Sequence, residues 1–241
     1  MKIGVITDIH ANYLALKAVI DALKKEQCEQ WICAGDFIGI GPRPEEVLRR
    51  VRQLPNLTAV CGNHELYLRQ GLPSQVPNEE GMGEEEIEGQ RWQQRQLSAE
   101  SVAFINQLPK KAMLEVEGKK IMVLHYAMDQ EQRYLPIEES SRMRLLALSE
   151  QADVIVYGHD HCRSIRCIHG RWLVCCGSLG CPASEKDVAR AGIIEITRES
   201  GVHVKALDIR YNVKQVLKDI DALAYPSAGE IKQFFYGVNP R

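Results

Sequence analysis

The sequence predicts an α/β protein in which two β-sheets pack face to face and helices cover their outer sides. Two patterns lead to this prediction. The first sixty residues alternate strand-like with helix-like segments, and the second half is dominated by closely spaced strand-like runs. Such alternation is typical of parallel strands joined by crossover helices, whereas closely spaced runs indicate antiparallel pairs. With 241 residues, of which 45% are hydrophobic, the chain can bury a full core. We expect one domain spanning residues 1–241.

Three strands and two helices are expected in the first sixty residues. Short apolar runs at 2–7, 30–34 and 57–61 each end at a polar residue. Between the first two runs, residues 12–25 have apolar side chains at helical spacing, which predicts a helix with one buried face. Pro44 is suited to the first turn of a second helix over residues 45–54.

Residues 65–108 interrupt this alternation. Prolines and glycines break the first part, and the acidic run 84–86 opens a polar helical stretch that extends to about residue 108. Such a charge run is usually the solvent-exposed face of a helix. Because the segment directly follows the third strand, residues 66–108 are also the candidate for a cap or insertion over a functional site.

The second half predicts a hairpin, two helices and further strands. Residues 112–116 and 120–124 flank a turn, and the second of these strands leads to His125. The remaining expected strands are 154–157, 164–168, 171–175, 192–196 and 202–209, and the expected helices are 140–150 and 213–223. We expect the apolar residues 231–238 of the C-terminal tail to pack within the chain, with a homodimer contact as the alternative.

Charge and cysteine content narrow the class of protein. A formal net charge of −2 argues against broad binding of nucleic acid or of an anionic membrane, although a small phosphorylated ligand stays open. The chain opens directly into a strand without a secretory signal, and no apolar stretch is long enough to span a bilayer. We therefore expect a cytoplasmic protein with no membrane partner. Its eight cysteines should be reduced, and Cys162 and Cys181 lie near the polar residues described next.

Five polar blocks stand at or just beyond the ends of strand-like runs. They are Asp8-x-His10, Gly35-Asp36, Gly62-Asn63-His64-Glu65, His125 and Gly158-His159-Asp160-His161. Ligands of α/β sheets collect beyond the carboxyl ends of the strands, and mixed oxygen and nitrogen donors suit one or two divalent metals. A glycine precedes the ligands in three blocks, as expected where the backbone turns sharply beside a crowded ion.

The ordered set D-x-H, G-D-x-x-G, G-N-H-E, H and G-H-x-H resembles the calcineurin-like metallophosphoesterase superfamily, and most closely its compact prokaryotic single-domain branch. The match extends over residues 8–161, with all blocks in the family's order. The resemblance implies a four-layer αββα sandwich, in which two mixed β-sheets pack face to face with the helices outside. It also implies a site for two divalent metal ions.

The resemblance further implies a role for each residue in the blocks. Seven residues would hold the metals: Asp8, His10 and His161 at one ion, Asn63, His125 and His159 at the other, and Asp36 between both. His64 corresponds to the family's catalytic histidine, which stabilises the transition state or protonates the leaving oxygen. Glu65 corresponds to an acidic residue that can orient that imidazole. Asp160 is expected to lie near the ligands without binding metal. The donor set accepts Fe, Zn, Co or Ni as well as Mn, the ion we favour.

The second block departs from the phosphoprotein phosphatases of the superfamily. Those enzymes have an acidic residue and an arginine after it, G-D-x-x-D-R, whereas this chain lacks the arginine at that place. The departure disfavours a phosphoprotein substrate. Arg43 and Arg133 are the candidates for binding phosphate instead.

Together these observations predict a metal-dependent phosphoesterase that hydrolyses a phosphomonoester or phosphodiester with a two-metal-activated hydroxide. We expect a small, nucleotide-like substrate, such as a cyclic nucleotide or a dinucleoside polyphosphate, because similar compact proteins hydrolyse such molecules. A nuclease of the same superfamily is one alternative, disfavoured because no basic stripe is present. A non-catalytic protein-binding scaffold is the other, disfavoured because all seven ligand positions and His64 are retained.

Overall fold

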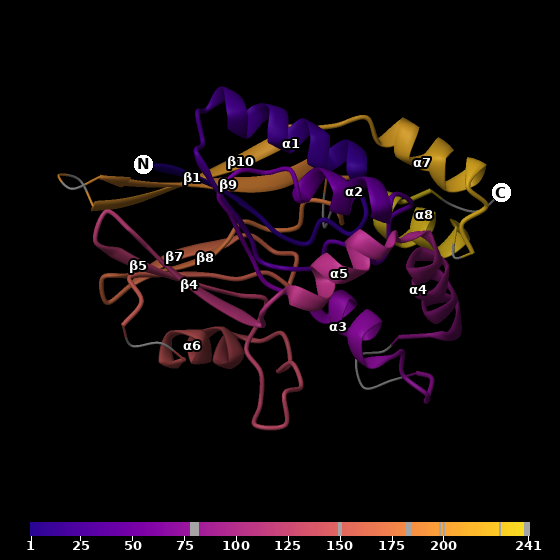
Figure 1. Ribbon diagram of the computed structural model, residues 1–241, viewed down its shortest axis with the longest axis horizontal. Coiled ribbons are helices and arrows are strands. Elements are labelled where there is room, and N and C mark those ends of the chain that lie inside the picture. The colour runs from indigo at the N-terminus through magenta and orange to yellow at the C-terminus, as the bar shows by residue number, and fades with distance from the viewer. Residues whose placement is uncertain are drawn as a thin grey trace.

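The computed structural model describes residues 1–77, 82–148, 151–181, 185–197, 199, 201–226 and 228–238. In this part of the chain, ten strands form two mixed five-stranded sheets that pack face to face, with helices on the outside (Figure 1). The predicted fold class is confirmed.

The first sheet combines three parallel strands with an antiparallel pair at one edge. Its strands are β1 (Lys2–Ile6), β2 (Gln30–Cys33), β3 (Leu57–Ala59), β9 (Val188–Thr197) and β10 (Gly201–Arg210). They are ordered β10-β9-β1-β2-β3, with β1, β2 and β3 parallel to one another. The helices α1 (Tyr13–Lys25) and α2 (Pro44–Val51) connect the parallel strands, as the alternation predicted.

The second sheet joins two hairpins to a central strand. Its strands are β4 (Lys111–Val116), β5 (Lys119–Leu124), β6 (Val154–Val156), β7 (Ser164–Ile168) and β8 (Arg171–Cys175). They are ordered β4-β5-β6-β8-β7, and β5, β6 and β8 are parallel. The helix α6 (Glu139–Ala147) covers the outer face of this sheet (Figure 1).

Three apolar cores separate the four layers, and β5 contributes to two of them. Successive side chains of a strand point to opposite faces of its sheet. Ile121 and Val123 therefore lie in the core between the sheets, while Met122 and Leu124 pack with Leu145 of α6 in the outer core. The third core lies between the first sheet and its helices.

The remaining helices are α3 (Asn63–Gln70), α4 (Glu84–Gln96), α5 (Ala99–Gln107), α7 (Val213–Ala222) and α8 (Ala228–Tyr236). Figure 1 shows α3, α4, α5 and α8 gathered at one end of the sandwich. Within the described ranges, no helix is both long and apolar enough to cross a membrane.

The structure contains two helices that we did not predict. α3 starts at the third polar block itself, where the Glu65 carboxylate accepts a hydrogen bond from the Gly62 N–H at 2.8 Å and completes the first turn. α8 occupies the C-terminal tail, and its Ile231 and Tyr236 are buried in the core beside the first sheet. Part of the tail thus packs within the chain, as a helix, whereas Phe234 and Val238 are exposed. The last two residues of the helix predicted over 140–150 lie outside the described residues.

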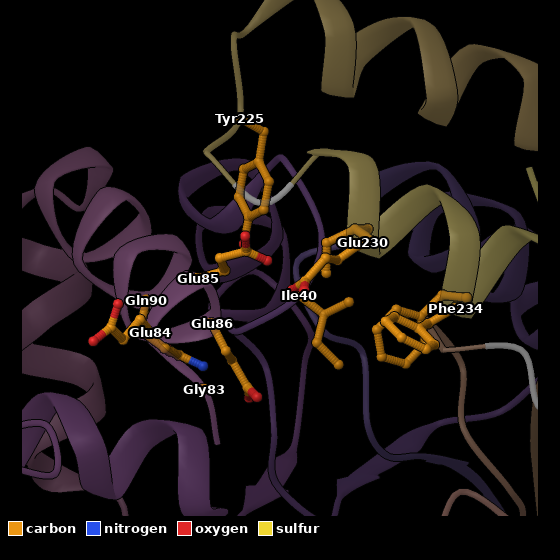
Figure 2. A pocket seen from close by; sticks show the side chains of 11 residues that line it. Ile40, Gly83, Glu84, Glu85, Glu86, Gln90, Tyr225, Glu230 and Phe234 are labelled. Atoms are coloured by element: carbon orange, nitrogen blue, oxygen red, sulfur yellow. The ribbon is translucent and has the colours of Figure 1, made fainter. Parts of the chain in front are cut away.

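A cavity of about 570 Å³ lies between α4 and α8 (Figure 2). Its lining combines acidic and aromatic side chains, which include Glu84, Glu85 and Glu86 of α4, Glu230 and Phe234 of α8, and Gln90. Ile40 and Glu86 line this cavity and also a larger one, which contains the candidate site.

Candidate metal centre

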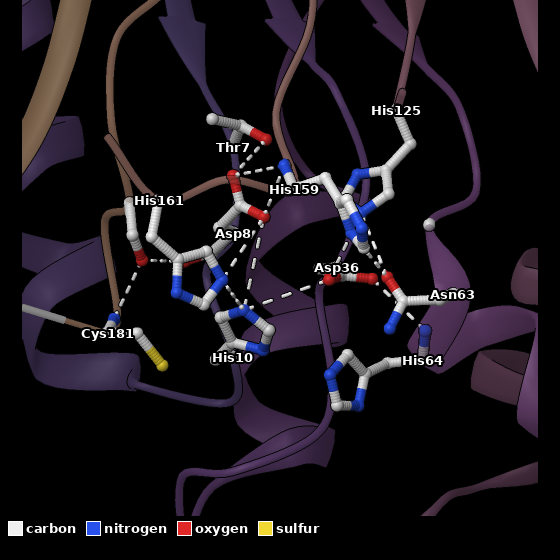
Figure 3. Close-up of polar contacts among 12 residues, drawn as sticks. Thr7, Asp8, His10, Asp36, Asn63, His64, His125, His159, His161 and Cys181 are labelled. Carbon is white, nitrogen blue, oxygen red and sulfur yellow. Dashed lines mark hydrogen bonds and ion pairs between the residues drawn. The ribbon is translucent and has the colours of Figure 1, made fainter. Parts of the chain in front are cut away.

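The five polar blocks converge at one end of the two sheets (Figure 3). The first three lie beyond β1, β2 and β3, and the last two follow β5 and β6. Ligand atoms of His10, Asp36 and His64 lie within 4.8 Å of one another, as do those of Asp36, His125 and His159. The structure therefore brings together residues that are far apart in the chain, such as His10 and His161, which are 151 positions apart.

The first group of donors contains Asp8, His10 and His161. The Nε2 atoms of His10 and His161 are 2.9 Å apart. Nε2 of His161 lies 3.6 Å from Oδ1 of Asp8, and Nε2 of His10 lies 3.8 Å from Oδ2 of Asp36. Asp8 and His10 are buried, whereas the His161 side chain is 26% exposed and faces the larger cavity.

The second group contains Asn63, His125 and His159. Oδ1 of Asn63 lies 3.1 Å from Nε2 of His125 and 3.2 Å from Nδ1 of His159. Nε2 of His125 is 3.2 Å from Oδ2 of Asp36. The same Asp36 oxygen thus adjoins both groups of donors.

Five of these donor residues have left-handed backbone conformations, which are uncommon for residues other than glycine. Their φ values are 51° at Asp8, 48° at His10, 54° at Asp36, 75° at His159 and 54° at His161. Hydrogen bonds between neighbouring loops fix this backbone, since Asp8 N–H donates to the Gly35 carbonyl and His10 N–H to the Asp36 carbonyl, at 3.1 and 3.0 Å. Conformations of this cost persist where the surrounding structure enforces them, as at functional sites.

The glycines of the blocks leave no room for a side chain. Gly35 has a φ of +97°, which L-residues rarely adopt. A Cβ on Gly62 would lie 2.1 Å from Oδ1 of Asp36, and one on Gly158 would lie 2.7 Å from Oδ2 of Asp8. The crowding expected at these glycines therefore comes chiefly from carboxylate side chains that lie close to the backbone.

Burial and mutual proximity set the charges of the centre. Burial lowers the pKa of His10 well below its usual value and that of His159 to about 3, so both rings are neutral and can act as ligands. Burial alone would also lower the pKa of His125, but the Asp36 carboxylate raises it to about 9. Burial would raise the pKa of Asp36, yet the imidazoles of His125 and His64 hold it well below its usual value. Without a metal, Asp36 and His125 therefore form an ion pair.

These donors fit divalent cations. Carboxylate and carboxamide oxygens and imidazole nitrogens converge in two adjoining groups, and they are mostly removed from water. This N/O donor set is suited to Mn, Fe, Zn, Co or Ni. Asp36, which adjoins both groups, is in position to be shared by two ions.

Two neighbours of the ligands have separate surroundings. Asp160, expected to lie beside the ligands without binding metal, accepts a hydrogen bond from Nε of Arg142 at 2.9 Å. Sγ of Cys181, a buried thiol, lies within 4.8 Å of ring nitrogens of His10 and His161. Cys181 therefore adjoins the first group of donors.

His64 lies at the edge of both groups. Its backbone N–H donates to Oδ1 of Asp36 at 3.1 Å, and its ring meets that of His10 edge-on, with centroids 4.9 Å apart. Nδ1 of the imidazole contacts the side-chain amide of Gln90 from α4.

The structure gives Glu65 a different role from the one predicted. Its buried carboxylate accepts hydrogen bonds from four backbone N–H groups: those of Asp36, Phe37, Ile38 and Gly62, at 2.9, 2.8, 3.2 and 2.8 Å. Burial and the neighbouring Asp36 raise the pKa of Glu65 to about 7. Glu65 thus ties the loop after β2 to the start of α3, because its oxygens are occupied by amides. The side chain that meets the His64 ring nitrogen is that of Gln90, which we did not predict.

The two arginines predicted to bind phosphate lie in different places. Arg43 pairs with Asp219 at 3.1 Å and with Glu46 at 3.0 Å, and it is not among the described residues that line the larger cavity. Arg133 does line that cavity, where its 57% exposed side chain also pairs with Asp129 at 3.0 Å. Arg133 thus lines the same cavity as the candidate centre, whereas Arg43 is paired with carboxylates of α2 and α7.

The candidate centre lies in a cavity of about 920 Å³. Polar ligands form one part of the lining, and apolar or aromatic residues form another: Leu66, Tyr67, Met82, Tyr134, Leu135, Pro136 and Ile137. The Tyr134 ring stacks on His159 with centroids 5.0 Å apart. We did not predict these residues, because no spacing or motif marks them in the sequence.

Solved structures share this architecture. A hypothetical protein from Pyrococcus horikoshii superposes with a TM-score of 0.81 over 99% of both chains, at 17% identity. A metallophosphoesterase from Sphaerobacter thermophilus gives a TM-score of 0.69 over 95% of this chain and 98% of that one, at 20% identity. At this level of identity the likeness concerns the fold.

Sequence comparison extends the likeness. An uncharacterized protein of Methanocaldococcus jannaschii is 28% identical over 131 residues, which are 51% of this chain and 48% of that protein. A symmetrical bis(5'-nucleosyl)-tetraphosphatase of Wigglesworthia glossinidia brevipalpis is 42% identical over 66 residues, 26% of this chain and 24% of that enzyme. The matches thus span about half and a quarter of these relatives. The family model of the calcineurin-like phosphoesterase superfamily domain matches residues 1–199. The chain therefore belongs to the calcineurin-like phosphoesterase superfamily.

Proposed function

We propose that the protein is a hydrolase that cleaves a phosphomonoester or phosphodiester with two divalent metal ions. The observation that supports this most is the pair of adjoining donor groups that meet at Oδ2 of Asp36, 3.8 Å from Nε2 of His10 and 3.2 Å from Nε2 of His125. Two-metal phosphoesterases require two such sites side by side.

Seven side chains of the chain would bind the two ions. Asp8, His10 and His161 would hold one ion, Asn63, His125 and His159 the other, and Asp36 both. Bound ions would supply Lewis-acid activation of water and neutralise charge on the phosphoryl group, and Mn is the ion we favour. The ligand residues need little rearrangement to accept them, because their backbone is already fixed by hydrogen bonds between loops.

His64 is the residue we assign to proton transfer. It lines the cavity beside the donor groups, and its ring is held by Gln90 while seven other side chains suffice for the ions. A positioned imidazole can protonate the leaving oxygen near neutral pH, because its ordinary pKa lies close to that pH.

The cavity favours a small substrate with a flat or apolar organic part. A volume of about 920 Å³ suits a ligand of nucleotide size, and the rings of Tyr67 and Tyr134, which contact His64 and His159, add aromatic lining beside the metal ligands. Arg133 at the cavity edge can meet a further phosphate. The tetraphosphatase relative acts on a dinucleoside substrate, and we propose a nucleotide-like phosphoester for this chain. Because Tyr67, Met82 and Glu86 line the cavity, we also propose that residues 66–108 cap the site within one domain over 1–241.

A panel of metals and substrates tests this function. Chelator-treated protein is reloaded with Mn, Fe, Zn, Co or Ni and incubated with aryl monoesters and diesters, cyclic nucleotides and dinucleoside tetraphosphates. We expect turnover of at least one class, lost on chelation and restored by Mn. No turnover of any substrate with any metal would contradict the proposal, provided that metal analysis finds the ions bound.

A further inference from the structure

The His64 imidazole is enclosed by three different elements. A Cβ on Gly39, in the loop after β2, would lie 2.2 Å from Nδ1 of His64, so the ring rests directly against the Gly39 backbone. Tyr67 of α3 meets the ring edge-on, with centroids 5.9 Å apart. The third contact is the Gln90 amide of α4 at Nδ1. Together these contacts leave the ring little freedom to turn.

The helix α4 is strongly polar, and two of its glutamines, Gln90 and Gln93, are buried. Gln90 is 2% exposed and Gln93 is fully buried. Gln93 accepts a hydrogen bond from the Gly39 N–H and donates one to the Gly41 carbonyl, both at 2.8 Å. Burying an amide is costly unless it is hydrogen-bonded. Gln93 meets that requirement with both ends of its amide, and Gln90 meets it with its nitrogen at His64, so α4 is built onto the candidate centre.

The amide of Gln90 is chemically suited to hold the His64 ring through Nδ1 in either tautomer. An amide carries both a donor and an acceptor, whereas a carboxylate only accepts. Nε2 of Gln90 contacts Nδ1, and its Oε1 has no hydrogen-bond partner among the described residues. Nε2 donates a hydrogen bond when Nδ1 carries no proton. If the amide rotates by half a turn, Oε1 instead accepts a hydrogen bond from Nδ1–H, and this oxygen loses no other hydrogen bond.

We propose that Gln90 is a positioning residue for His64. It holds the imidazole through Nδ1 and so leaves Nε2 oriented to deliver a proton to the leaving oxygen. The inference rests on the proposed function, because it requires His64 to act on a bound phosphoester. In this proposal α4 both covers the cavity and positions the catalytic histidine.

The dependence of rate on leaving group tests this role. An alkoxide leaving group needs protonation, whereas p-nitrophenolate departs without it. We expect Gln90→Leu to lower kcat for an alkyl phosphoester about 10- to 100-fold, since a misplaced catalytic group costs rate on this scale. kcat for the matching p-nitrophenyl ester should stay within about threefold of wild type, and KM for both esters should change little. Gln90→Glu, which keeps an acceptor for Nδ1–H, should restore most of the alkyl-ester rate.

Three further measurements separate positioning from damage to the fold. Gln94→Leu, on the same helix, should behave as wild type with both esters. Metal content and thermal stability report whether each variant is folded and loaded. Long-range ¹H–¹⁵N spectra of the zinc-loaded protein, assigned with His64→Ala, should show a shifted Nδ1 signal in Gln90→Leu.

The outcomes are distinguishable. If metal-loaded wild type hydrolyses neither these esters nor any other substrate of the panel, the proposed function fails. If His64→Ala slows both esters equally, the proton-donor role of His64 fails. If His64→Ala is selective but Gln90→Leu matches wild type, or slows both esters equally, the inference about Gln90 is overturned while the proposed function stands.

Discussion

The candidate metal centre and the proposed cap beside it are held in place in opposite ways. The centre comes from loops at the ends of two sheets, and backbone-to-backbone hydrogen bonds such as that from His10 N–H to the Asp36 carbonyl fix it. The proposed cap, residues 66–108, reaches the centre through side chains of α4, above all Gln90 and Gln93. A centre built from backbone tolerates few changes, whereas a cap attached by side chains can vary while the centre persists.

The largest expected effect comes from Asp36, where the two donor groups meet. Asp36→Ala should lower kcat/KM by at least about a thousandfold, because both ions lose a shared ligand. Elemental analysis should find fewer than two ions bound per chain. The exposed Asp21→Ala serves as the control. A variant that kept two ions would show that Asp36 does not bridge them.

Metal affinity should depend steeply on pH. In the metal-free protein the pKa of His125 is raised to about 9 by Asp36, so below that pH an ion must displace a proton. Affinity should therefore rise up to about tenfold per pH unit between pH 7 and 9, and level off above. Calorimetry in buffers of different ionisation enthalpy measures the released proton. A flat profile would contradict the Asp36–His125 ion pair.

Paired glycine substitutions compare the centre with the peripheral helix α8. Gly62→Ala should destabilise the fold by about 1–3 kcal/mol and weaken metal binding, because its Cβ would lie 2.1 Å from Oδ1 of Asp36. Gly229→Ala in α8 meets nothing within 4 Å and should be neutral or stabilising by up to about 1 kcal/mol. Denaturant unfolding measures both. Equal destabilisation would remove the distinction between the two regions.

The smallest expected effect comes from the attachment of the cap. Gln93→Leu leaves the Gly39 N–H and the Gly41 carbonyl without their side-chain partner, which should cost about 1–2 kcal/mol. Metal stoichiometry should remain that of wild type, since the ligands are fixed by other bonds. A loss of bound metal would show that the cap helps to build the centre.

The centre was largely predictable because its residues carry local signals. Each block stands at the end of a strand, and a β-α-β order brings such ends to one edge. The partner of His64 was not predictable, because Gln90 and Gln93 look no different in the sequence from Gln94 or Gln96. Only the packing of α4 distinguishes them.

Other misses have the same origin. Arg43 is close to the second block in sequence, but the chain turns there and Asp219 of α7 binds its guanidinium. Glu65 was expected to contact the His64 imidazole, but its carboxylate instead accepts hydrogen bonds from four backbone amides of two loops. α8 was read as a tail because Pro226 and Gly229 are helix breakers, whereas burial of Tyr236 stabilises it.

The donor residues with left-handed backbone conformations lie on loops of both sheets, and this placement determines when during synthesis the site can form. His159 is synthesised 151 residues after Asp8, and His161 follows His10 at the same separation. The backbone N–H of His159 then donates to Oδ1 of Asp8 at 3.0 Å, across the two sheets. A nascent chain therefore cannot complete the site, and contacts of such long sequence separation form late in folding. An ion that binds the finished site would connect the two sheets and stabilise the fully folded molecule relative to partly folded ones.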